Sequence, residues 1–224
     1  MKNLQKHLMR ATDKHDIRPA LRGVEFNTEA KRMNATDSHR LLSFDYDGTL
    51  IENKIVDLNT MEVIEANYPN VLRIIARTGT DMVVNFSEIN RSKISSLTKN
   101  KKAIIEVILE NEVFTMRAKT LINSGLNSKM DIVELFTLKC KSNRPQAPYK
   151  VTGNKAHYRS NAVDAPSVVM YLNAEYLRDC LDFLLDYSKE TKESTFTIRL
   201  TGKYHPLIFT GNKFDYLITP IRKN

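Results

Sequence analysis

The chain has 224 residues, 42% of them hydrophobic, which is enough to bury the core of one large domain or of two small ones. Seven glycines and seven prolines exclude a collagen-like or low-complexity chain. The longest apolar runs fall far short of the roughly 18 residues that cross a bilayer, and the N-terminus lacks the apolar segment of a secretory signal. A cytoplasmic protein with no membrane contact is therefore expected, and its net charge of +8 favours polyanionic partners.

Residues 3–15 are expected to form an amphipathic helix, because apolar side chains recur on one face of it. That face contains Leu4, Leu8, Met9 and Ala11. Basic side chains recur every four residues along another face, namely Lys2, Lys6, Arg10 and Lys14. This basic stripe either faces phosphates or is an ordinary solvated helix surface, and the helix alone does not decide between the two.

Short apolar segments separated by polar turns follow, which is typical of strands. Strands are expected at 20–26 (ALRGVEF), 32–36 (RMNAT) and 40–46 (RLLSFDY). Together they predict an antiparallel meander. The Asp47-Gly48 pair that comes next favours a tight reversal, so the chain leaves the last strand in a turn.

A second helix is expected at 87–99, with Ser87 as its N-cap. Its inward residues would be Ile89, Ile94 and Leu97, and its outward residues would be Arg91 and Lys99. Strands at 103–111, 113–119 and 132–141 follow it.

A third helix is expected at about 174–187, with Leu177, Leu181 and Leu184 buried. Three more strands, at 195–202, 205–211 and 214–221, complete the chain. Residues 142–167 are polar and basic and contain three prolines, which indicates a long loop insertion. One helix followed by several antiparallel strands, three times over, predicts an α+β fold.

The two cysteines, Cys140 and Cys180, have neither metal-ligand spacing nor a neighbouring histidine, so both are interpreted as reduced core thiols. No metal and no cofactor are expected.

One stretch, LLSFDYDGTLIEN at 41–53, is similar to the catalytic motif of haloacid-dehalogenase-type phosphohydrolases. In that hypothesis Asp45 is the nucleophile, Asp47 is the general acid and base, and Mg²⁺ lies between them. Such enzymes need a parallel sheet and a second acidic motif, and this sequence has no Gly-Asp or Asp-Asp dipeptide. The magnesium-dependent phosphohydrolase is therefore the enzyme alternative and not the preferred function.

Three separated stretches carry a stronger resemblance. They are RPALRGVEFN followed by NATDSHRLLSF, then MEVIEANYPNVLRII, and finally MYLNAEYLRDCLDFL through HPLIF to YLITPIR. In this order they resemble the bacterial replication sliding clamp, the beta subunit of DNA polymerase III. The resemblance implies a DNA-clamp-like fold with helices packed on antiparallel sheets.

The resemblance also implies a domain layout. Residues 1–77 are similar to the first half of the family's middle domain plus the connector, and residues 78–224 are similar to its last domain, with the loop insertion at about 142–167. The family's first domain has no counterpart. A shortened and divergent clamp of this kind suggests a phage or another mobile element.

The function that the resemblance implies is that of a DNA replication processivity factor, which is not an enzyme. It would form a homo-oligomer, hold double-stranded DNA without sequence preference, and bind short peptides of DNA polymerase and clamp-loader proteins in a pocket. The alternative within binding proteins is an adaptor or decoy for clamp-binding peptides that forms no ring.

Carried over position by position, the resemblance implies a peptide pocket between the middle and last domains. Its residues would be Leu21, Thr36, Ser38, His39, Arg40, Leu41, Pro69, Arg73, Ile74, Asn173, Tyr176, Leu217, Thr219, Pro220, Ile221 and Arg222. Taken singly, Leu21, Leu41, Ile74 and Leu217 could be core residues, and His39 could cap a turn. Thr219 stands where the family usually has Met, which predicts a smaller and more polar wall.

DNA contacts are expected from helices whose basic side chains face phosphates across a wide hole. The expected residues are Lys2, Lys6, Arg10, Lys14, Arg91 and Lys99. The third helix carries an acidic row that would repel DNA unless it faces elsewhere, formed by Glu175, Asp179, Asp182 and Asp186. Rings of the family carry twelve pore helices, so the resemblance together with three helices per chain implies a tetrameric ring. Three chains would need a fourth helix in each, for which 119–131 is the only candidate.

Overall fold

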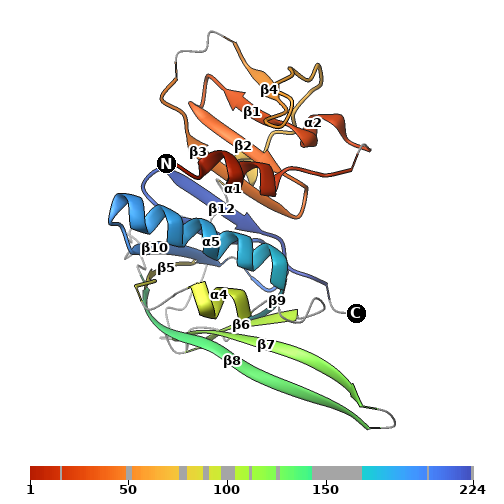
Figure 1. The fold of residues 1–224 in the computed structure, drawn as a ribbon. Helices are drawn as coiled ribbons and strands as arrows, with labels where there is room; N and C mark the ends of the chain where they lie inside the picture. The colour runs from red at the N-terminus through yellow and green to blue at the C-terminus, as the bar shows by residue number, and fades with distance from the viewer. Residues whose placement is uncertain are drawn as a thin grey trace, which may run out of the picture.

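The computed structural model in Figure 1 describes residues 1–15, 17–48, 52–75, 80–87, 91–96, 104–110, 113–124, 127–142, 168–200 and 202–222. The first elements are helix α1 (Leu4–Ala11), the helical turn α2 (Pro19–Arg22) and strands β1 (Val24–Asn27), β2 (Arg32–Thr36), β3 (Arg40–Asp45) and β4 (Lys54–Val56). The remaining elements are α3 (Leu72–Ile75), β5 (Thr80–Asn85), α4 (Arg91–Ser96), β6 (Ile104–Glu110), β7 (Val113–Ser124), β8 (Asn127–Ser142), β9 (Val168–Asn173), α5 (Ala174–Thr191), β10 (Thr195–Leu200), β11 (Leu207–Thr210) and β12 (Phe214–Ile218).

The described strands form one 12-stranded sheet in the order β4-β1-β2-β3-β12-β11-β10-β5-β8-β7-β6-β9. Every described pair of neighbours is antiparallel. At the centre, β12 pairs with β3 from Phe214↔Phe44 to Ile218↔Arg40, so the end of the chain is joined to its beginning. This junction makes one continuous sheet of the two halves.

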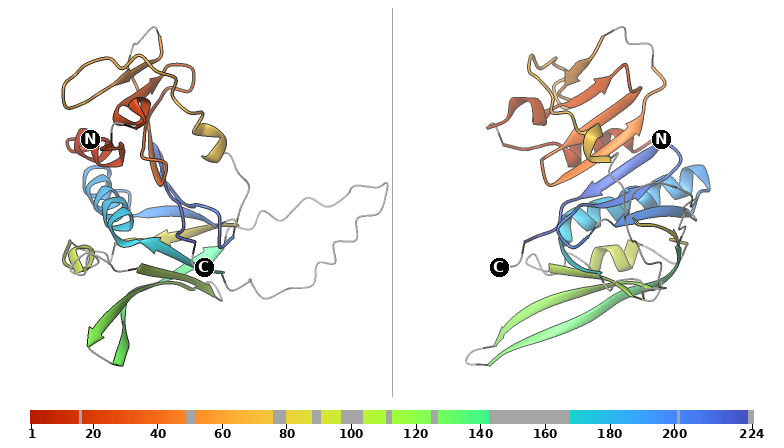
Figure 2. Two further views of the ribbon diagram at one scale, coloured as in Figure 1. Left: turned by 90° about the vertical axis from the view of Figure 1, so that its right-hand side faces the viewer. Right: turned by 180° about the vertical axis from the view of Figure 1, so that it is seen from behind.

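The helices α1, α4 and α5 lie on one side of the sheet, whereas the short α3 lies on the other side (Figure 2, left). The main core is between α5 and the central strands. Its aromatic centre includes Phe214, whose ring centroid is 4.8 Å from those of Phe183 and Tyr187 in edge-to-face geometry. Strand alternation directs Leu42 and Phe44 into this core and Leu41 to the opposite face.

Two elements near the N-terminus differ from the sequence-based predictions. Helix α1 ends at Ala11 and not at residue 15, because the backbone of Thr12 is extended and the Asp13 amide donates to the Leu21 carbonyl at 2.8 Å. The strand predicted at 20–26 begins only at Val24. Before it, Pro19 starts a helical turn, which suits the fixed φ of proline.

The C-terminal half contains further corrections. The weak helix candidate at 119–131 is wrong, because β7 and β8 pair from Val113↔Lys139 to Ser124↔Asn127 and extend as a long ribbon. Strands β5 and β9 were not predicted. The second helix is described only as α4, where Ile94 is buried as expected, while Ile89, Leu97 and Lys99 lie outside the described residues. Strand β8 runs to Ser142, and the rest of the predicted loop at 142–167 also lies outside them.

The fold excludes the phosphohydrolase hypothesis. Asp45 ends β3, whose neighbours β2 and β12 are both antiparallel to it, and its carboxylate accepts from Arg32. Asp47 is exposed and lies 3.6 Å from the Lys213 ammonium. Within the described residues, no three His, Cys, Asp or Glu side chains form a possible metal site.

None of the helices in the described part of the chain is long and apolar enough to cross a membrane.

Candidate functional site

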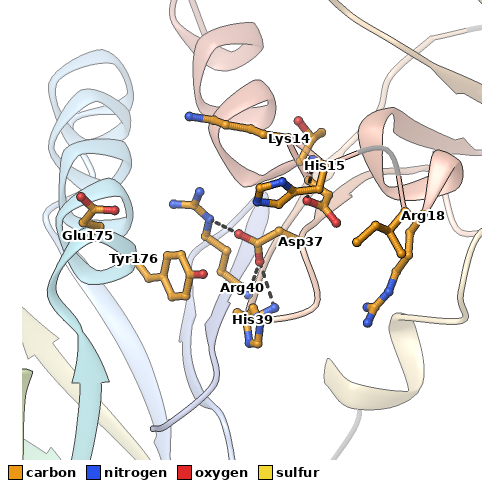
Figure 3. Close-up of a pocket in the computed structure, with 11 residues that line it drawn as sticks. Lys14, His15, Arg18, Asp37, His39, Arg40, Glu175 and Tyr176 are labelled. Atoms are coloured by element: carbon orange, nitrogen blue, oxygen red, sulfur yellow. Dashed lines mark hydrogen bonds and ion pairs between the residues drawn. The ribbon is translucent and has the colours of Figure 1, made fainter.

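A pocket of about 450 Å³ opens where three segments meet beside the central strands (Figure 3). The connection between α1 and α2 supplies Lys14, His15, Ile17 and Arg18. The turn between β2 and β3 supplies Asp37, His39 and Arg40, and the first turn of α5 supplies Glu175 and Tyr176. The pocket therefore combines an aromatic wall with charged groups of both signs, a lining that suits a peptide more than an apolar ligand.

The turn between β2 and β3 is fixed by its own side chains. The Asp37 carboxylate accepts from the amides of His39 and Arg40, both at 2.9 Å. The Thr36 hydroxyl donates to the Arg40 carbonyl at 2.6 Å and accepts from the Ser38 amide at 3.1 Å. Ser38 takes the left-handed conformation (φ 75°), which these hydrogen bonds hold in place. The result is a rigid turn that presents His39 at the pocket.

Arg40 is the structural centre of the pocket, although it is only 7% exposed. Its Nε donates to Asp37 at 3.0 Å, and its Nη1 donates to Asp179 of α5 at 2.5 Å. Its guanidinium also lies 4.6 Å from the centroid of the Tyr176 ring. Because buried arginine is stabilised only when its donors are paired, these contacts fix the turn against α5.

The start of α5 orients the aromatic wall. Asn173 caps the helix, since its side-chain oxygen accepts from the Glu175 amide at 2.8 Å. Tyr176 then lies in the first helical turn, with its ring within 14° of parallel to the His39 ring and 6.0 Å from it. Two predicted pocket residues from distant parts of the chain are thus brought together.

A second group of predicted pocket residues lies on the opposite face of the sheet. Leu41 and Leu217 are directly paired across β3 and β12, and they pack with Val71 and Ile208 in an apolar cluster. Ile74 packs against this cluster from α3. All four central residues are at most 5% exposed, and Tyr68, Ile74 and Ile75 pack against them, so the segment 68–75 covers the cluster. Leu41 and Leu217 are therefore core residues in this conformation, which is the alternative that the sequence left open.

The end of the chain lies beside the pocket. The amide and hydroxyl of Thr219 donate to the His39 carbonyl at 2.8 and 2.9 Å, and the Ile221 amide donates to the Tyr171 carbonyl at 2.7 Å. Pro220 is between them, and Ile221 and Arg222 are exposed. Of the other predicted residues, Leu21 is buried, and Pro69 and Arg73 are exposed in the segment 68–75.

Sequence reasoning missed several residues that build this site. Asp37, His15, Ile17 and Arg18 line the pocket, and Asp179 holds its central arginine. Asp37 had a readable signal, because an Asp at the start of a short polar turn commonly caps that turn. Asp179 had none, since its partner lies 139 residues away in the sequence.

The helix side of the sheet collects the basic residues that were expected to contact DNA. Lys2, Lys6, Lys14 and Arg91 are exposed on or beside α1 and α4, and Lys99 lies outside the described residues. Helix α5 lies between α1 and α4 (Figure 1). Its acidic row is paired with arginines of these two helices. Arg10 of α1 lies 3.2 Å from Asp182, and Arg91 of α4 pairs with Asp182 and Asp186.

Comparison with solved structures finds the same fold in bacterial sliding clamps. The beta sliding clamp of Caulobacter crescentus superposes with a TM-score of 0.66 at 14% identity, covering 99% of this chain and 64% of that one. The beta subunits of DNA polymerase III from Thermotoga maritima and Pseudomonas aeruginosa both give a TM-score of 0.63, at 15% and 16% identity. They cover 100% and 99% of this chain and 64% and 65% of theirs.

No protein-family model and no curated protein sequence matches the chain. The chain spans a little under two thirds of the length of the clamps that it resembles. The likeness is one of architecture at low sequence identity. The fold of this chain is that of the DNA polymerase III beta sliding clamp.

Proposed function

We propose that the chain is a sliding-clamp-like processivity factor of DNA replication, a binding protein and not an enzyme. The observation that carries the proposal is the agreement between fold and site. His39, Arg40 and Tyr176, which were expected at a peptide pocket on sequence resemblance alone, line one open pocket in a chain with the clamp fold.

The ligand of the pocket would be a short peptide of a DNA polymerase or a clamp-loader-type protein. The rings of His39 and Tyr176 offer a flat surface to an apolar or aromatic anchor. Lys14, Arg18 and Glu175 lie around them and would pair with the peptide backbone and charged side chains. The exposed Ile17 supplies apolar contact area at the rim.

Peptide binding is tested with a dye-labelled peptide that carries a Gln and a Leu-x-Leu-Phe tail, followed by fluorescence anisotropy. We expect micromolar affinity, and we expect Tyr176→Ala to weaken it about tenfold or more, because truncating an aromatic residue at a binding site commonly costs over 1 kcal/mol. The matched control is Tyr204→Ala, which removes an exposed tyrosine from the turn between β10 and β11. Equal losses in the two variants, or no binding by the wild type, would contradict the proposed pocket.

Double-stranded DNA would lie along the helix side, held by phosphates without sequence preference. Lys2 and Lys6 are exposed on this side, while Lys31 and Lys203 lie in turns between strands. We expect Lys2→Gln with Lys6→Gln to reduce the slope of log affinity against log salt by roughly 0.9 for each phosphate that these lysines neutralise in the wild type. Lys31→Gln with Lys203→Gln removes the same charge from elsewhere, and an equal change there would indicate only diffuse attraction.

Homo-oligomerisation belongs to the proposal, because a clamp retains DNA by closing around it. A closed ring needs one head-to-tail interface whose rotation closes. Light scattering of the purified protein measures this directly, and an oligomer is the expected result. A strict monomer at high concentration would favour the adaptor or decoy function in place of a ring.

A further inference from the structure

A continuous row of ion pairs connects the pocket to the helix side of the molecule. It begins at Arg40, which contacts Asp37 and Asp179, and it continues along α5 through Asp182 and Asp186. These three carboxylates of α5 are three and four residues apart, so they lie on one face of the helix. Arg10 of α1 and Arg91 of α4 bridge them from the two neighbouring helices.

Asp179 links the pocket part of this row to the part on the helix side. Its Oδ2 accepts from Arg40 at 2.5 Å, which is the contact to the pocket. Its Oδ1 accepts from Arg178, the preceding residue of α5, at 2.8 Å. The same Oδ1 lies 3.6 Å from Arg10 Nη1, and this ion pair is the contact to the helix side. Asp179 is only 5% exposed, so water and salt screen these interactions weakly.

Arg10 has a choice of partners that Arg40 does not have. It is about one third exposed and approaches Asp179 and Asp182 from the neighbouring helix α1. A phosphate of bound DNA would compete for its guanidinium, because arginine pairs with phosphate as readily as with carboxylate. Arg40 is buried between Asp37 and Asp179, so the Asp179 carboxylate that Arg10 leaves remains paired with Arg40 at the pocket and with its helix neighbour Arg178.

We propose that Asp179 is a positioning residue that couples the pocket to the helix side, so that duplex DNA bound at Arg10 raises the affinity of the pocket for its peptide. When Arg10 turns to a phosphate, Asp179 interacts more strongly with Arg40. Arg40 then holds the turn that carries His39, and the Tyr176 ring, in one arrangement. The inference rests on the proposed function, and thermodynamic linkage requires the peptide to raise the affinity for DNA by the same factor.

The experiment measures peptide affinity with and without a saturating short duplex. For the wild type we expect the duplex to tighten peptide binding by about fivefold or more, at the lower end of typical coupling between sites. In Arg10→Gln the ratio of the peptide affinities with and without duplex should fall to about 1. Arg10 is then no longer present to exchange between Asp179 and phosphate, while the buried pair of Arg40 and Asp179 remains. Asp179→Asn should also abolish the ratio, but it leaves a buried arginine short of a partner, so Arg10→Gln is the decisive variant.

Lys6→Gln is the matched control. It removes one positive charge from the same helix one turn earlier, where no ion pair to α5 is observed among the described residues. With the duplex raised to saturation, this variant should keep the wild-type ratio. Loss of the ratio in Lys6→Gln as well as in Arg10→Gln would show that general charge and not Asp179 carries the effect, and it would overturn the inference.

A measurement without peptide separates this inference from the proposed function. The NMR signal of the Arg40 Nε–H, which donates to Asp37, should shift when the duplex is added to the wild type and should stay fixed in Arg10→Gln. A shift together with no peptide binding would refute the peptide pocket and retain the link from Arg10 through Asp179 to Arg40. Peptide and duplex that both bind with unchanged affinities and leave this signal unmoved would overturn the coupling and retain the pocket.

Discussion

His7 should make the protein less stable as the pH falls below neutrality. Its side chain is 1% exposed, Nε2 lies 3.1 Å from the Asp186 carboxylate, and Nδ1 is buried with no hydrogen-bond partner among the described residues. Burial lowers the pKa of His7 below its usual 6.5, and this outweighs the nearby Asp186, while Arg10 and Lys6 act in the same direction as burial. Protonation would place a second N–H donor where no described group accepts from it.

The sign follows from the lowered pKa. The unfolded chain binds a proton at His7 near pH 6.5, whereas the folded chain resists it until lower pH, so acid favours unfolding. The stabilising contribution is complete above about pH 6.5 and is lost progressively as the pH falls through the folded pKa. One titrating group can change the free energy of unfolding by at most about 1.4 kcal/mol per pH unit, so a fall of up to about 2 kcal/mol between pH 6.5 and pH 5 is the upper limit.

The assay is urea unfolding followed by circular dichroism at several pH values between about 7 and 5. His7→Asn should lower stability at pH 7 but flatten its dependence on pH. His15→Asn, at an exposed position, should leave the slope unchanged. Asp186 also has a lowered pKa, because the hydrogen bonds from His7 and Asn3 and the charge of Arg91 outweigh burial, but its effect appears only as the pH falls below about 4. A wild-type slope that persists in His7→Asn, or stability that rises towards pH 5, would refute the reasoning.

Two further predictions concern the core. Phe214→Ala should reduce the free energy of unfolding by about 3–5 kcal/mol, because the ring is 1% exposed and removing it leaves a cavity beside Phe183 and Tyr187, and urea titration measures the loss. Cys180 should not react with a thiol reagent in the folded protein and should react fully in urea, because it is buried and burial raises its pKa well above the usual value. Rapid modification of Cys180 under native conditions would show that α5 opens readily.

The parts of the fold that the sequence predicts well are those with a clear period. In 32–46 two short apolar segments flank a polar turn, and this pattern places β2 and β3 within one residue of their observed bounds. The start of α5 is also predicted correctly, since Leu177, Leu181 and Leu184 recur at helical spacing after Asn173, but the helix runs to Thr191 and not to residue 187. The three clamp-like stretches then place His39 and Tyr176 at one site, although nothing in either segment alone predicts their contact.

The parts that the sequence does not predict lack such a period. The segment 119–131 mixes polar and apolar residues, and its pairing within the β7–β8 ribbon decides its structure. The segment 20–26 was predicted as a strand, but the fixed φ of Pro19 starts the helical turn α2 at its beginning instead. The acidic row of α5 was expected to repel DNA unless it faced elsewhere, and its ion pairs with Arg10 and Arg91 were not predicted. Both arginines are far from α5 in the sequence, and only the packing of α1 and α4 brings them to it.

The pairing of β3 with β12 also governs the order in which the molecule can be completed on the ribosome. Arg32 of β2 contacts Asp215 of β12, 183 residues further along the chain. At about 5–20 residues per second, synthesis of that interval takes roughly 10 to 35 s. During this time the N-terminal meander has an open edge at β3, and an unpaired strand edge is a template for aggregation. Nascent chains that stall before Phe214 should therefore depend on chaperones, and native folding should begin only after the last strand has emerged.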